Sequence, residues 1–305
     1  MVNLSSPPAP DGRFAPSPTG PLHLGSLRTA LLAWLFARSQ SARFLVRIED
    51  LDPQRSRREY ERGQLDDLRT LGLDWDETPV RQSERMTLYE DALARLDAQG
   101  RLYPCFCTRA EIREAASAPH DALPDGGYPG TCRTLTEAER ARRRAGGRPF
   151  ALRVRAYEER VEFDDRIRGR CGGVVDDFVV RRADGVPAYQ LAVVVDDAAQ
   201  AVGEVVRGDD LLDSTPRQIL LARLLGLPEP HYAHVPLVFG AGGARLAKRS
   251  RPAGLADRRE PPAATLALLA HTLGLALGCD RVGRPAELLS EFDPERLPRE
   301  PAVLG

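Results

Sequence analysis

A histidine stands at the point where a loop rich in proline and glycine gives way to a helix. Pro16, Pro18 and Pro21 fix the backbone of the loop and remove amide donors. Leucines then recur at helical spacing over residues 24–37, so we expect a helix that begins beside His23. The free amides and positive dipole end of a helix N-terminus favour phosphate. This pattern fits a phosphate site to which His23 adds a donor, and it also fits a histidine that only caps the helix.

A second candidate site is a group of three cysteines. Cys105 and Cys107 form a C-x-C pair, and Cys132 follows after a loop rich in glycine, proline and aspartate. Thiolates are soft ligands that suit zinc, and such a spacing can surround one tetrahedral ion. A fourth ligand could come from Tyr128 or His120, of which histidine is the commoner kind. The spacing therefore favours a zinc site over three buried thiols without a metal.

A third candidate is a lysine that follows several glycines. Residues 240–243 are rich in glycine and lead into the basic stretch 245–249, which contains Lys248. A cation on a flexible loop can close over phosphates, so this stretch predicts a phosphate contact by Lys248. An exposed turn is the alternative interpretation of the same residues.

Two charged residues follow predicted strands. Residues 43–48 are typical of a buried strand and are followed by Glu49, and residues 202–206 are a candidate strand followed by Arg207. With the helix from residue 24, the first strand indicates a β-α-β unit, and hence an α/β fold with a doubly wound parallel sheet. Ligands of such sheets bind at the carboxyl ends of strands, so we expect Glu49 and Arg207 to face the crevice beside the proline loop. A solvated acidic loop and a surface arginine are the alternatives.

The remaining periodicity sets the order of the elements. Further helices are expected at 57–71, 86–99, 134–144, 215–225, 263–277 and 285–289. Further strands are expected at 150–155, 161–165, 174–181 and 234–239. The expected parts of the chain are a disordered leader (1–11), the first half of a nucleotide-binding fold (12–101), an inserted subdomain (102–186), the second half with the glycine-rich loop (187–255) and a C-terminal helical segment (256–305).

Length and composition limit the class of protein. A chain of 305 residues suits one or two domains, and its net charge of −1 restricts any nucleic-acid surface to a local patch. No apolar run approaches the roughly 20 residues that span a bilayer, so no membrane partner is expected. The N-terminus lacks the pattern of a secretory signal, and an odd number of cysteines, five, fits reduced thiols better than a disulfide framework. We therefore expect a cytoplasmic protein.

Three stretches resemble parts of a known family. RFAPSPTGPLHLGSLRTAL resembles the first signature of class I aminoacyl-tRNA synthetases in its glutamate-type form, with HLGS at residues 23–26 in the place of His-x-Gly-His. Residues 245–249 resemble the second signature, K-L-S-K-R, with Arg245 in place of lysine and Ala247 in place of serine. C-x-C followed by Y-x-x-x-C resembles the zinc insertion of glutamyl-queuosine tRNA(Asp) synthetases. The resemblance covers about residues 12–255.

The resemblance implies a fold and a set of site residues. The implied fold is a Rossmann-like class I synthetase sheet with an inserted zinc-bearing, acceptor-type subdomain and C-terminal helices. The implied ligands of one structural zinc ion are Cys105, Cys107, Tyr128 and Cys132. The implied ATP-binding residues are His23, Gly25, Ser26 and Lys248. The implied catalytic residues are the histidine and the lysine of that set. The implied glutamate-binding residues are Arg13, Ala15, Ser17, Glu49, Tyr189 and Arg207.

The resemblance also implies a reaction. ATP, with Mg²⁺, would activate L-glutamate to glutamyl-adenylate, and the glutamyl group would pass to the queuosine base at the wobble position of tRNA(Asp). About 50 residues follow residue 255, too few for the anticodon-binding domain of longer glutamyl-tRNA synthetases. Val193 stands where those relatives have asparagine, which implies weaker glutamate binding or an altered dependence on tRNA.

Three other activities stay open at this point. The chain could be a truncated glutamyl-tRNA synthetase that charges the tRNA 3′ end, or a small-molecule nucleotidyltransferase with the same first signature. It could also be a non-catalytic zinc protein that binds tRNA. In each case we expect a monomer.

Overall fold

The computed structural model describes residues 10–108, 110–112, 127–240, 255, 260–275 and 282–304. Three features of the sequence lie outside these residues: most of the predicted leader, His120, and the basic stretch that contains Lys248. None of the helices that the structure describes is long and apolar enough to cross a membrane.

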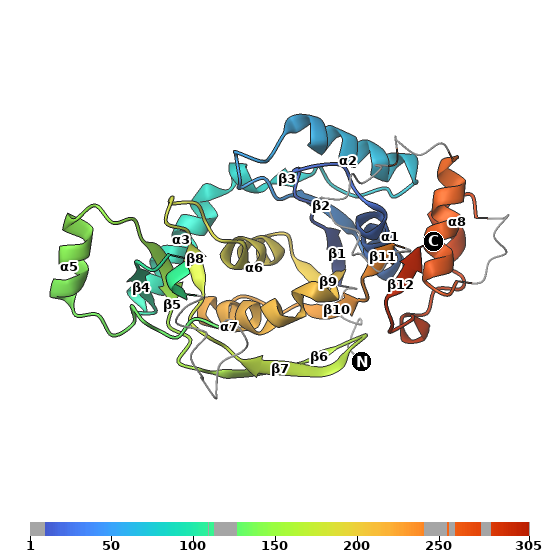
Figure 1. The fold of residues 1–305 in the computed structure, drawn as a ribbon. Coiled ribbons are helices and arrows are strands. Elements are labelled where there is room, and N and C mark those ends of the chain that lie inside the picture. Colours follow the sequence, from blue (N-terminus) through green and yellow to red (C-terminus); the bar gives the residue numbers. More distant parts are fainter. Residues whose placement is uncertain are drawn as a thin grey trace, which may run out of the picture.

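A seven-stranded sheet forms the centre of the molecule, with the strand order β3-β2-β1-β9-β10-β6-β7 (Figure 1). Neighbouring strands are parallel, except in the hairpin of β6 and β7 at one edge. The strands of this sheet are β1 (Asp11–Phe14), β2 (Phe44–Ile48), β3 (Val80–Arg81), β6 (Arg160–Asp165), β7 (Gly169–Val174), β9 (Val202–Gly208) and β10 (His231–Val235). The predicted α/β fold with a parallel sheet is confirmed.

Helices connect the strands and pack around the sheet (Figure 1). The α-helices are α1 (Leu24–Ser39), α2 (Arg58–Thr70), α3 (Met86–Ala98), α5 (Glu137–Ala145), α6 (Tyr189–Ala199), α7 (Thr215–Leu225) and α8 (Pro262–Thr272). The 3-10 helices are η1 (Gln82–Glu84), η2 (Asp209–Ser214), η4 (Pro285–Leu288) and η5 (Pro294–Arg296). Two small sheets complete the structure, one of β4 (Leu102–Cys105), β5 (Ala151–Val154) and β8 (Val179–Arg181), the other of β11 (Val238–Gly240) and β12 (Ala302–Leu304).

The proline loop lies between β1 and α1, where a β-α-β unit places its first connection. β1 is not among the expected strands, because four residues just before a proline run carry too little periodicity to identify a strand. Its backbone is held by parallel pairing with β2 on one side and β9 on the other. β1 begins at Asp11, so the boundary predicted for the leader is wrong by one residue.

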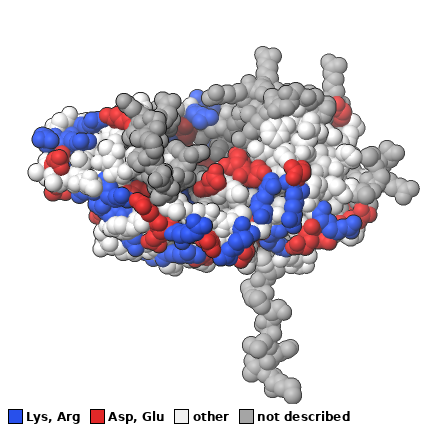
Figure 2. Space-filling model, turned by 60° about the horizontal axis from the view of Figure 1, so that its bottom comes forward, with Lys and Arg blue, Asp and Glu red and all other residues white. Residues whose placement is uncertain are grey.

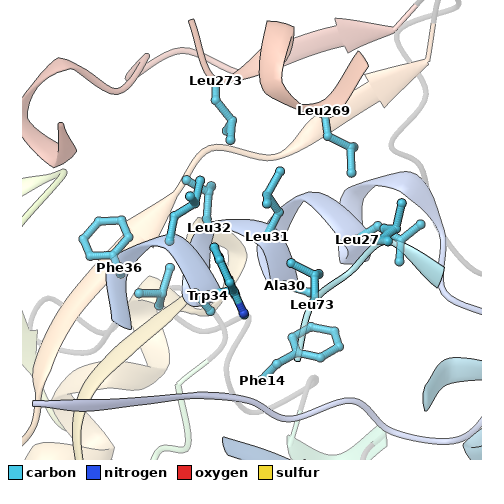
Figure 3. Close-up of a cluster of buried hydrophobic side chains, with 14 of the residues drawn as sticks. Phe14, Leu27, Ala30, Leu31, Leu32, Trp34, Phe36, Leu73, Leu269 and Leu273 are labelled. Carbon is cyan, nitrogen blue, oxygen red and sulfur yellow. The ribbon is translucent and has the colours of Figure 1, made fainter. Parts of the chain in front are cut away.

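α1 is the centre of the larger hydrophobic core (Figure 3). Leu27 and Leu31 are completely or almost completely buried, and Leu269 of α8 and Phe14 of β1 pack in the same cluster. A helix that is apolar on every face belongs in the interior, and burial of each large side chain contributes roughly 1.5–3 kcal/mol. This packing fixes the N-terminus of α1, and with it His23, relative to the sheet.

The segment expected to be one inserted subdomain divides between two sheets. β4, β5 and β8 form an antiparallel sheet beside α5 at one end of the molecule, whereas β6 and β7 join the central sheet next to β10 (Figure 1). The strand expected at 174–181 is interrupted, because Val174 ends β7 and only Val179–Arg181 form a strand, β8. Asp176 and Asp177 lie between β7 and β8, and their carboxylates accept hydrogen bonds from the Tyr128 N–H (2.9 Å) and the Tyr103 hydroxyl (2.6 Å). These buried contacts redirect the chain from one sheet to the other.

The hairpin of β6 and β7 presents a surface of mixed charge. Glu162 pairs with Arg160 and Arg170, and Asp164 also pairs with Arg170. Figure 2 shows acidic and basic side chains interspersed over the face that this hairpin helps to form. Because opposite charges alternate there, the hairpin is not the basic patch that a nucleic-acid surface needs.

Proline and glycine explain two other differences from the expected elements. The strand expected at 234–239 is divided into β10 and β11 around Pro236, which has no amide hydrogen to donate to a sheet. The helix expected at 263–277 ends at Thr272, because Gly274 has a φ of 70° in the left-handed region. The helix expected at 285–289 is the 3-10 helix η4.

Candidate active site

A cavity of about 490 Å³ opens at the carboxyl ends of β1, β2 and β9. Its walls come from the proline loop, the first turn of α1, the residue after β2 and the first residue of α6. The predicted site residues that line it are Arg13, Ala15, Ser17, His23, Gly25, Ser26, Glu49, Tyr189 and Arg207. Every predicted glutamate or ATP residue within the described ranges thus lies at one cavity, where parallel α/β sheets bind ligands. Lys248 lies outside those ranges.

His23 caps the N-terminus of α1 at the rim of this cavity. Its Nδ1 accepts the backbone N–H of Ser26 at 3.1 Å, and its Nε2 lies 3.1 Å from the Ser26 hydroxyl. A Cβ at Gly25 would lie 3.1 Å from the His23 ring, so glycine leaves the space into which the ring folds. His23 therefore caps the helix, as one of the two interpretations expects. In this position its ring also lies beside the backbone amides at the start of α1.

Two buried arginines share one carboxylate behind the cavity. Arg13 donates from Nε to Asp197 Oδ1 at 3.3 Å and from Nη1 to the carbonyl oxygen of Val206 at 3.3 Å. Arg47 has no solvent exposure, and it donates to the same Asp197 oxygen at 2.6 Å and to Glu49 at 3.3 Å. Asp197 thus joins Arg13 to Arg47, and Arg47 contacts Glu49. These contacts fix the wall that contains Arg13 relative to the wall that contains Glu49.

These contacts and burial shift the pKa values of Arg47, Asp197 and Glu49. Burial alone would lower the pKa of Arg47, but the carboxylates of Asp197, Glu49 and Asp196 raise it. Burial works against ionised Asp197, but the charges of Arg13 and Arg47 keep its pKa below the ordinary value. Burial raises the pKa of Glu49 despite the same two arginines. Glu49 is therefore the carboxylate here that gains most from a cationic ligand.

Arg207 reaches the cavity from the end of β9 and is 5% exposed. Its Nε donates to His234 Nε2 at 3.1 Å, and its Nη2 donates to the Thr215 hydroxyl at 2.8 Å. Its Nη1 lies 3.5 Å from the Tyr189 hydroxyl. His234 Nδ1 in turn lies 2.6 Å from Asp165 on β6. The guanidinium is thus held from behind and faces the cavity.

Tyr189 and Val193 differ in what they contact, although both belong to α6. Tyr189 lines the cavity, and burial raises the pKa of its hydroxyl. Val193 lies one turn further on, is 2% exposed and packs in the second core cluster rather than at the cavity wall. The effect of this valine on glutamate binding stays a prediction.

Five residues behind the site are absent from the predicted set. They are Arg47, Asp165, Asp197, Thr215 and His234. Two of them carried a usable signal, because Arg47 interrupts the apolar run FLVRI and Asp197 follows the apolar run LAVVV directly after Asp196. A charge within an apolar run indicates a buried partner, but the sequence does not say which residue that partner is.

A second cavity, of about 710 Å³, adjoins the first. The two share Ser17, Glu49 and Tyr189. The rest of the second cavity is lined by apolar residues and by a set of polar residues and cysteines: Asp52, Gln82, Cys105, Cys107, Arg153, Arg182 and Asp184. The inserted segment therefore forms part of the wall of the second cavity, which meets the first cavity at the three shared residues.

The four predicted metal ligands lie together beside this second cavity. The Sγ atoms of Cys105, Cys107 and Cys132 lie within 4.8 Å of one another. The Tyr128 hydroxyl oxygen is 3.4 Å from Cys105 Sγ and 3.8 Å from Cys107 Sγ. Ligands of a tetrahedral zinc ion are separated by roughly 3.5–4 Å, so this donor set fits zinc. His120, the other candidate, lies outside the described residues.

The surroundings of the cysteines favour a thiolate. Hydrogen bonds with Cys132 and Tyr128, together with the charge of Arg153, lower the pKa of Cys105 to about 4. The pKa of Cys132 is raised, because it is the donor in its contact with Cys105 and because it is buried. The Arg153 guanidinium lies 3.7 Å from the centre of the Tyr128 ring. A buried cation beside sulfur and phenol oxygen suits a site whose ligands carry negative charge.

Comparisons with known proteins agree with this geometry. Residues 11–274 match the family model for the catalytic domain of class I tRNA synthetases of the E and Q type. The glutamyl-Q tRNA(Asp) synthetase of Nocardia farcinica is 59% identical over 96% of this chain and 92% of its own length. That of Symbiobacterium thermophilum is 53% identical over 95% and 94%. A crystal structure of a glutamate tRNA ligase from Elizabethkingia meningosepticum has a TM-score of 0.82 at 27% identity, over 97% of this chain and 67% of its own.

The chain therefore belongs to the class I aminoacyl-tRNA synthetases of the glutamyl and glutaminyl type. Within that class it belongs to the same family as the two glutamyl-Q tRNA(Asp) synthetases, and it is accordingly a ligase. The resemblance stated from the two signatures and the cysteine pattern is thereby confirmed.

Proposed function

We propose that the protein activates L-glutamate with ATP and transfers the glutamyl group to the queuosine base at the wobble position of tRNA(Asp). The observation that carries this proposal is the single cavity at the carboxyl ends of β1, β2 and β9, which collects the predicted glutamate and ATP residues. The names of the two most similar relatives cited above support the choice of acceptor.

The charges around the cavity suit a bound glutamate. Arg13 and Arg207 both keep N–H groups for a ligand, because each uses only part of its guanidinium on protein partners. In the proposed pose Arg13 binds the side-chain carboxylate with two parallel hydrogen bonds. Glu49 accepts from the α-ammonium, whose charge stabilises the ionised form of this buried carboxyl. Arg207, with the Tyr189 hydroxyl, completes the pocket.

Activation needs no general base. The α-carboxylate of glutamate is already ionised at neutral pH and attacks the α-phosphate of ATP directly; the bond to the β-phosphate breaks and pyrophosphate leaves. Catalysis then consists of positioning and of stabilising the charge that moves onto the phosphates. His23 and the first amides of α1 would supply donors at this cavity. Lys248, which lies outside the described residues, would add a positive charge. Mg²⁺ enters with ATP as part of the substrate.

The second cavity offers space for the acceptor. It shares Glu49 and Tyr189 with the first cavity, so an activated glutamyl group held there would lie at the boundary of the two. At about 710 Å³ it is within the range of sites that enclose a small molecule, and its walls are mostly apolar with a few polar side chains that offer partners to a base and a ring diol. We place the queuosine base here, with one ring hydroxyl attacking the carbonyl carbon of the glutamyl-adenylate, so that an ester bond forms and AMP leaves.

The cysteine cluster would hold one structural zinc ion. Its ligands would be Cys105, Cys107, Tyr128 and Cys132, which already lie at suitable separations. Zinc would then tie the C-x-C turn after β4 to the segment before α5, in a part of the chain with a small core of its own. It takes no part in the reaction proposed here.

The test is transfer of labelled glutamate to purified tRNA(Asp), with and without queuosine, after removal of the 3′-terminal adenosine. We expect label only on the queuosine-containing tRNA, and unchanged by loss of the terminal adenosine. Label on intact tRNA(Glu) that disappears with its 3′ adenosine would instead support a truncated glutamyl-tRNA synthetase. Absence of glutamate-dependent pyrophosphate exchange, with another small acid active in its place, would support a nucleotidyltransferase.

A further inference from the structure

A buried histidine stands behind Arg207, on the side away from the cavity. His234 of β10 has no solvent exposure. Its Nε2 lies 3.1 Å from Arg207 Nε, and its Nδ1 lies 2.6 Å from Asp165 Oδ2. Asp165 ends β6, the strand of the inserted segment that pairs with β10. The contact therefore links the edge of the sheet to a wall of the cavity.

The donors and acceptors of this chain allow one arrangement of protons. The Nε–H of Arg207 can only donate, so His234 Nε2 must accept. The proton of a neutral ring then lies on Nδ1 and is donated to Asp165. The Thr215 hydroxyl accepts from Arg207 Nη2 at 2.8 Å, and its own hydrogen can be donated to His234 Nε2 at 3.1 Å or to the Leu211 carbonyl oxygen at 3.4 Å. A proton on His234 Nε2 would place two donors 3.1 Å apart.

Asp165 is itself fixed by the backbone. Its Oδ1 accepts N–H groups from Ile167 at 3.0 Å and from Arg168 at 2.8 Å, and the His234 N–H is shared between Oδ1 at 3.2 Å and Oδ2 at 3.1 Å. Oδ2 is thereby directed at the imidazole ring of His234. The orientation of the carboxyl is determined before any ligand arrives, and the tautomer of the histidine follows from it.

The same arrangement leaves the charge of Arg207 available. Arg13 and Arg47 are paired directly with carboxylates. Arg207, in contrast, makes no ion pair with any residue that the structure describes, and its partners there are the neutral side chains of His234, Thr215 and Tyr189. A guanidinium held by neutral acceptors keeps its attraction for an anionic ligand.

We infer that Asp165 and His234 are positioning residues for Arg207, with the neutral Nδ1–H tautomer of His234 presenting Nε2 to the guanidinium. The pair orients Arg207 towards an anionic group in the cavity without neutralising it. The inference rests on the proposed function only for the identity of that anion, which is a carboxylate of bound glutamate.

Burial keeps the His234 ring neutral, although two of the three charges that face it favour the charged form. These charges come from Asp165 on β6, Arg207 on β9 and Asp209 in η2, while Thr215 of α7 and the stacked ring of Tyr232 complete its surroundings. Burial is the main cause that lowers the pKa of His234, and Arg207 lowers it further. The hydrogen bond to Asp165 works in the opposite direction and is outweighed.

Asp165→Asn tests the pair with almost no change of shape. Because the N–H groups of Ile167 and Arg168 require an oxygen at one end of the side chain, the amide –NH₂ must face His234 Nδ1. The ring proton is then forced onto Nε2, opposite the Arg207 donor. We expect the KM for glutamate in pyrophosphate exchange to rise about tenfold or more, with a smaller change in kcat. Asp164→Asn is the matched control, because Asp164 directly precedes Asp165 but has a side chain that is 78% exposed and pairs with Arg170. This variant should leave the KM for glutamate and the kcat unchanged.

Nitrogen-15 NMR of the imidazole groups gives a readout independent of activity. Five histidines are present, and His234→Gln identifies the signals of the buried one. We expect the Nδ1–H tautomer in the wild type and the Nε2–H tautomer in Asp165→Asn. A wild-type ring protonated at Nε2, or an Asp165→Asn variant with wild-type tautomer and KM, would overturn the inference. If the wild type fails to activate glutamate, the proposed function fails, whereas the tautomer still decides for or against the positioning pair. If Asp165→Asn does not fold, the His234 tautomer in the wild-type spectrum alone decides for or against the inference.

Discussion

Replacing Asp197 by asparagine removes one negative charge from between two buried arginines and keeps the shape of the side chain. Loss of one partner from a buried ion pair costs about 3–5 kcal/mol. Arg47 keeps two other carboxylates, Glu49 at 3.3 Å and Asp196 at 3.8 Å. We therefore expect the lower end, a decrease of about 3 kcal/mol in the free energy of unfolding at neutral pH. Arg13 also loses its anchor, so the KM for glutamate should rise about tenfold.

Denaturant unfolding followed by circular dichroism measures the first effect, and pyrophosphate exchange measures the second. Glu229→Gln is the matched control, because it removes a carboxylate from an exposed pair with Arg223 and should cost about 0–1 kcal/mol. The two arginines lower the pKa of Asp197, so its contribution is present above the ordinary value of 3.8 and is lost as the pH falls through the lowered pKa. The difference between variant and wild type should shrink in strongly acidic solution. Equal stability of the Asp197 and Glu229 variants at neutral pH would refute the reasoning.

Three other predictions follow from the site. Because burial raises the pKa of Glu49, acidification through that raised pKa should protonate the residue and raise the KM for glutamate. The Glu49→Gln variant should bind glutamate weakly at every pH. A wild-type KM that does not change with pH would contradict this prediction. Cys132→Ser should lose the zinc that elemental analysis measures and should unfold at a lower denaturant concentration. Cys171→Ser, outside the cluster, should keep the zinc content and the stability of the wild type. A wild-type protein without metal would contradict the zinc assignment. Lys248→Ala should lower the kcat of pyrophosphate exchange by at least about tenfold, and full activity would remove Lys248 from the mechanism.

The sequence could predict the elements whose signal is local. The leucines of α1 recur at helical spacing, so the position of the helix beside His23 follows from the residues themselves. Glu49 and Arg207 meet at one cavity although they are far apart in the chain, because the carboxyl ends of parallel strands share one edge of the sheet. A general rule of α/β folds was enough to bring them together.

The parts that could not be predicted depend on tertiary partners. The Arg47 contact with Asp197 spans 150 residues, and the His234 contact with Asp165 spans 69. A buried charge can be suspected from its apolar neighbours, but its partner is decided by packing. The position of β6 in the central sheet could not be predicted for the same reason, because it depends on pairing with β10, a strand far along the chain. Roles in catalysis, the zinc ion and the monomeric state stay predictions.

The central claim is that glutamate and ATP meet in the cavity at the carboxyl ends of β1, β2 and β9. A crystal structure with a non-hydrolysable glutamyl-adenylate analogue tests it most directly. We predict the side-chain carboxylate of the analogue on Arg13, its ammonium at Glu49, its phosphate beside His23 and its carbonyl group near Arg207. An analogue bound with its glutamyl group in the 710 Å³ cavity, or away from Arg13 and Glu49, would contradict the account.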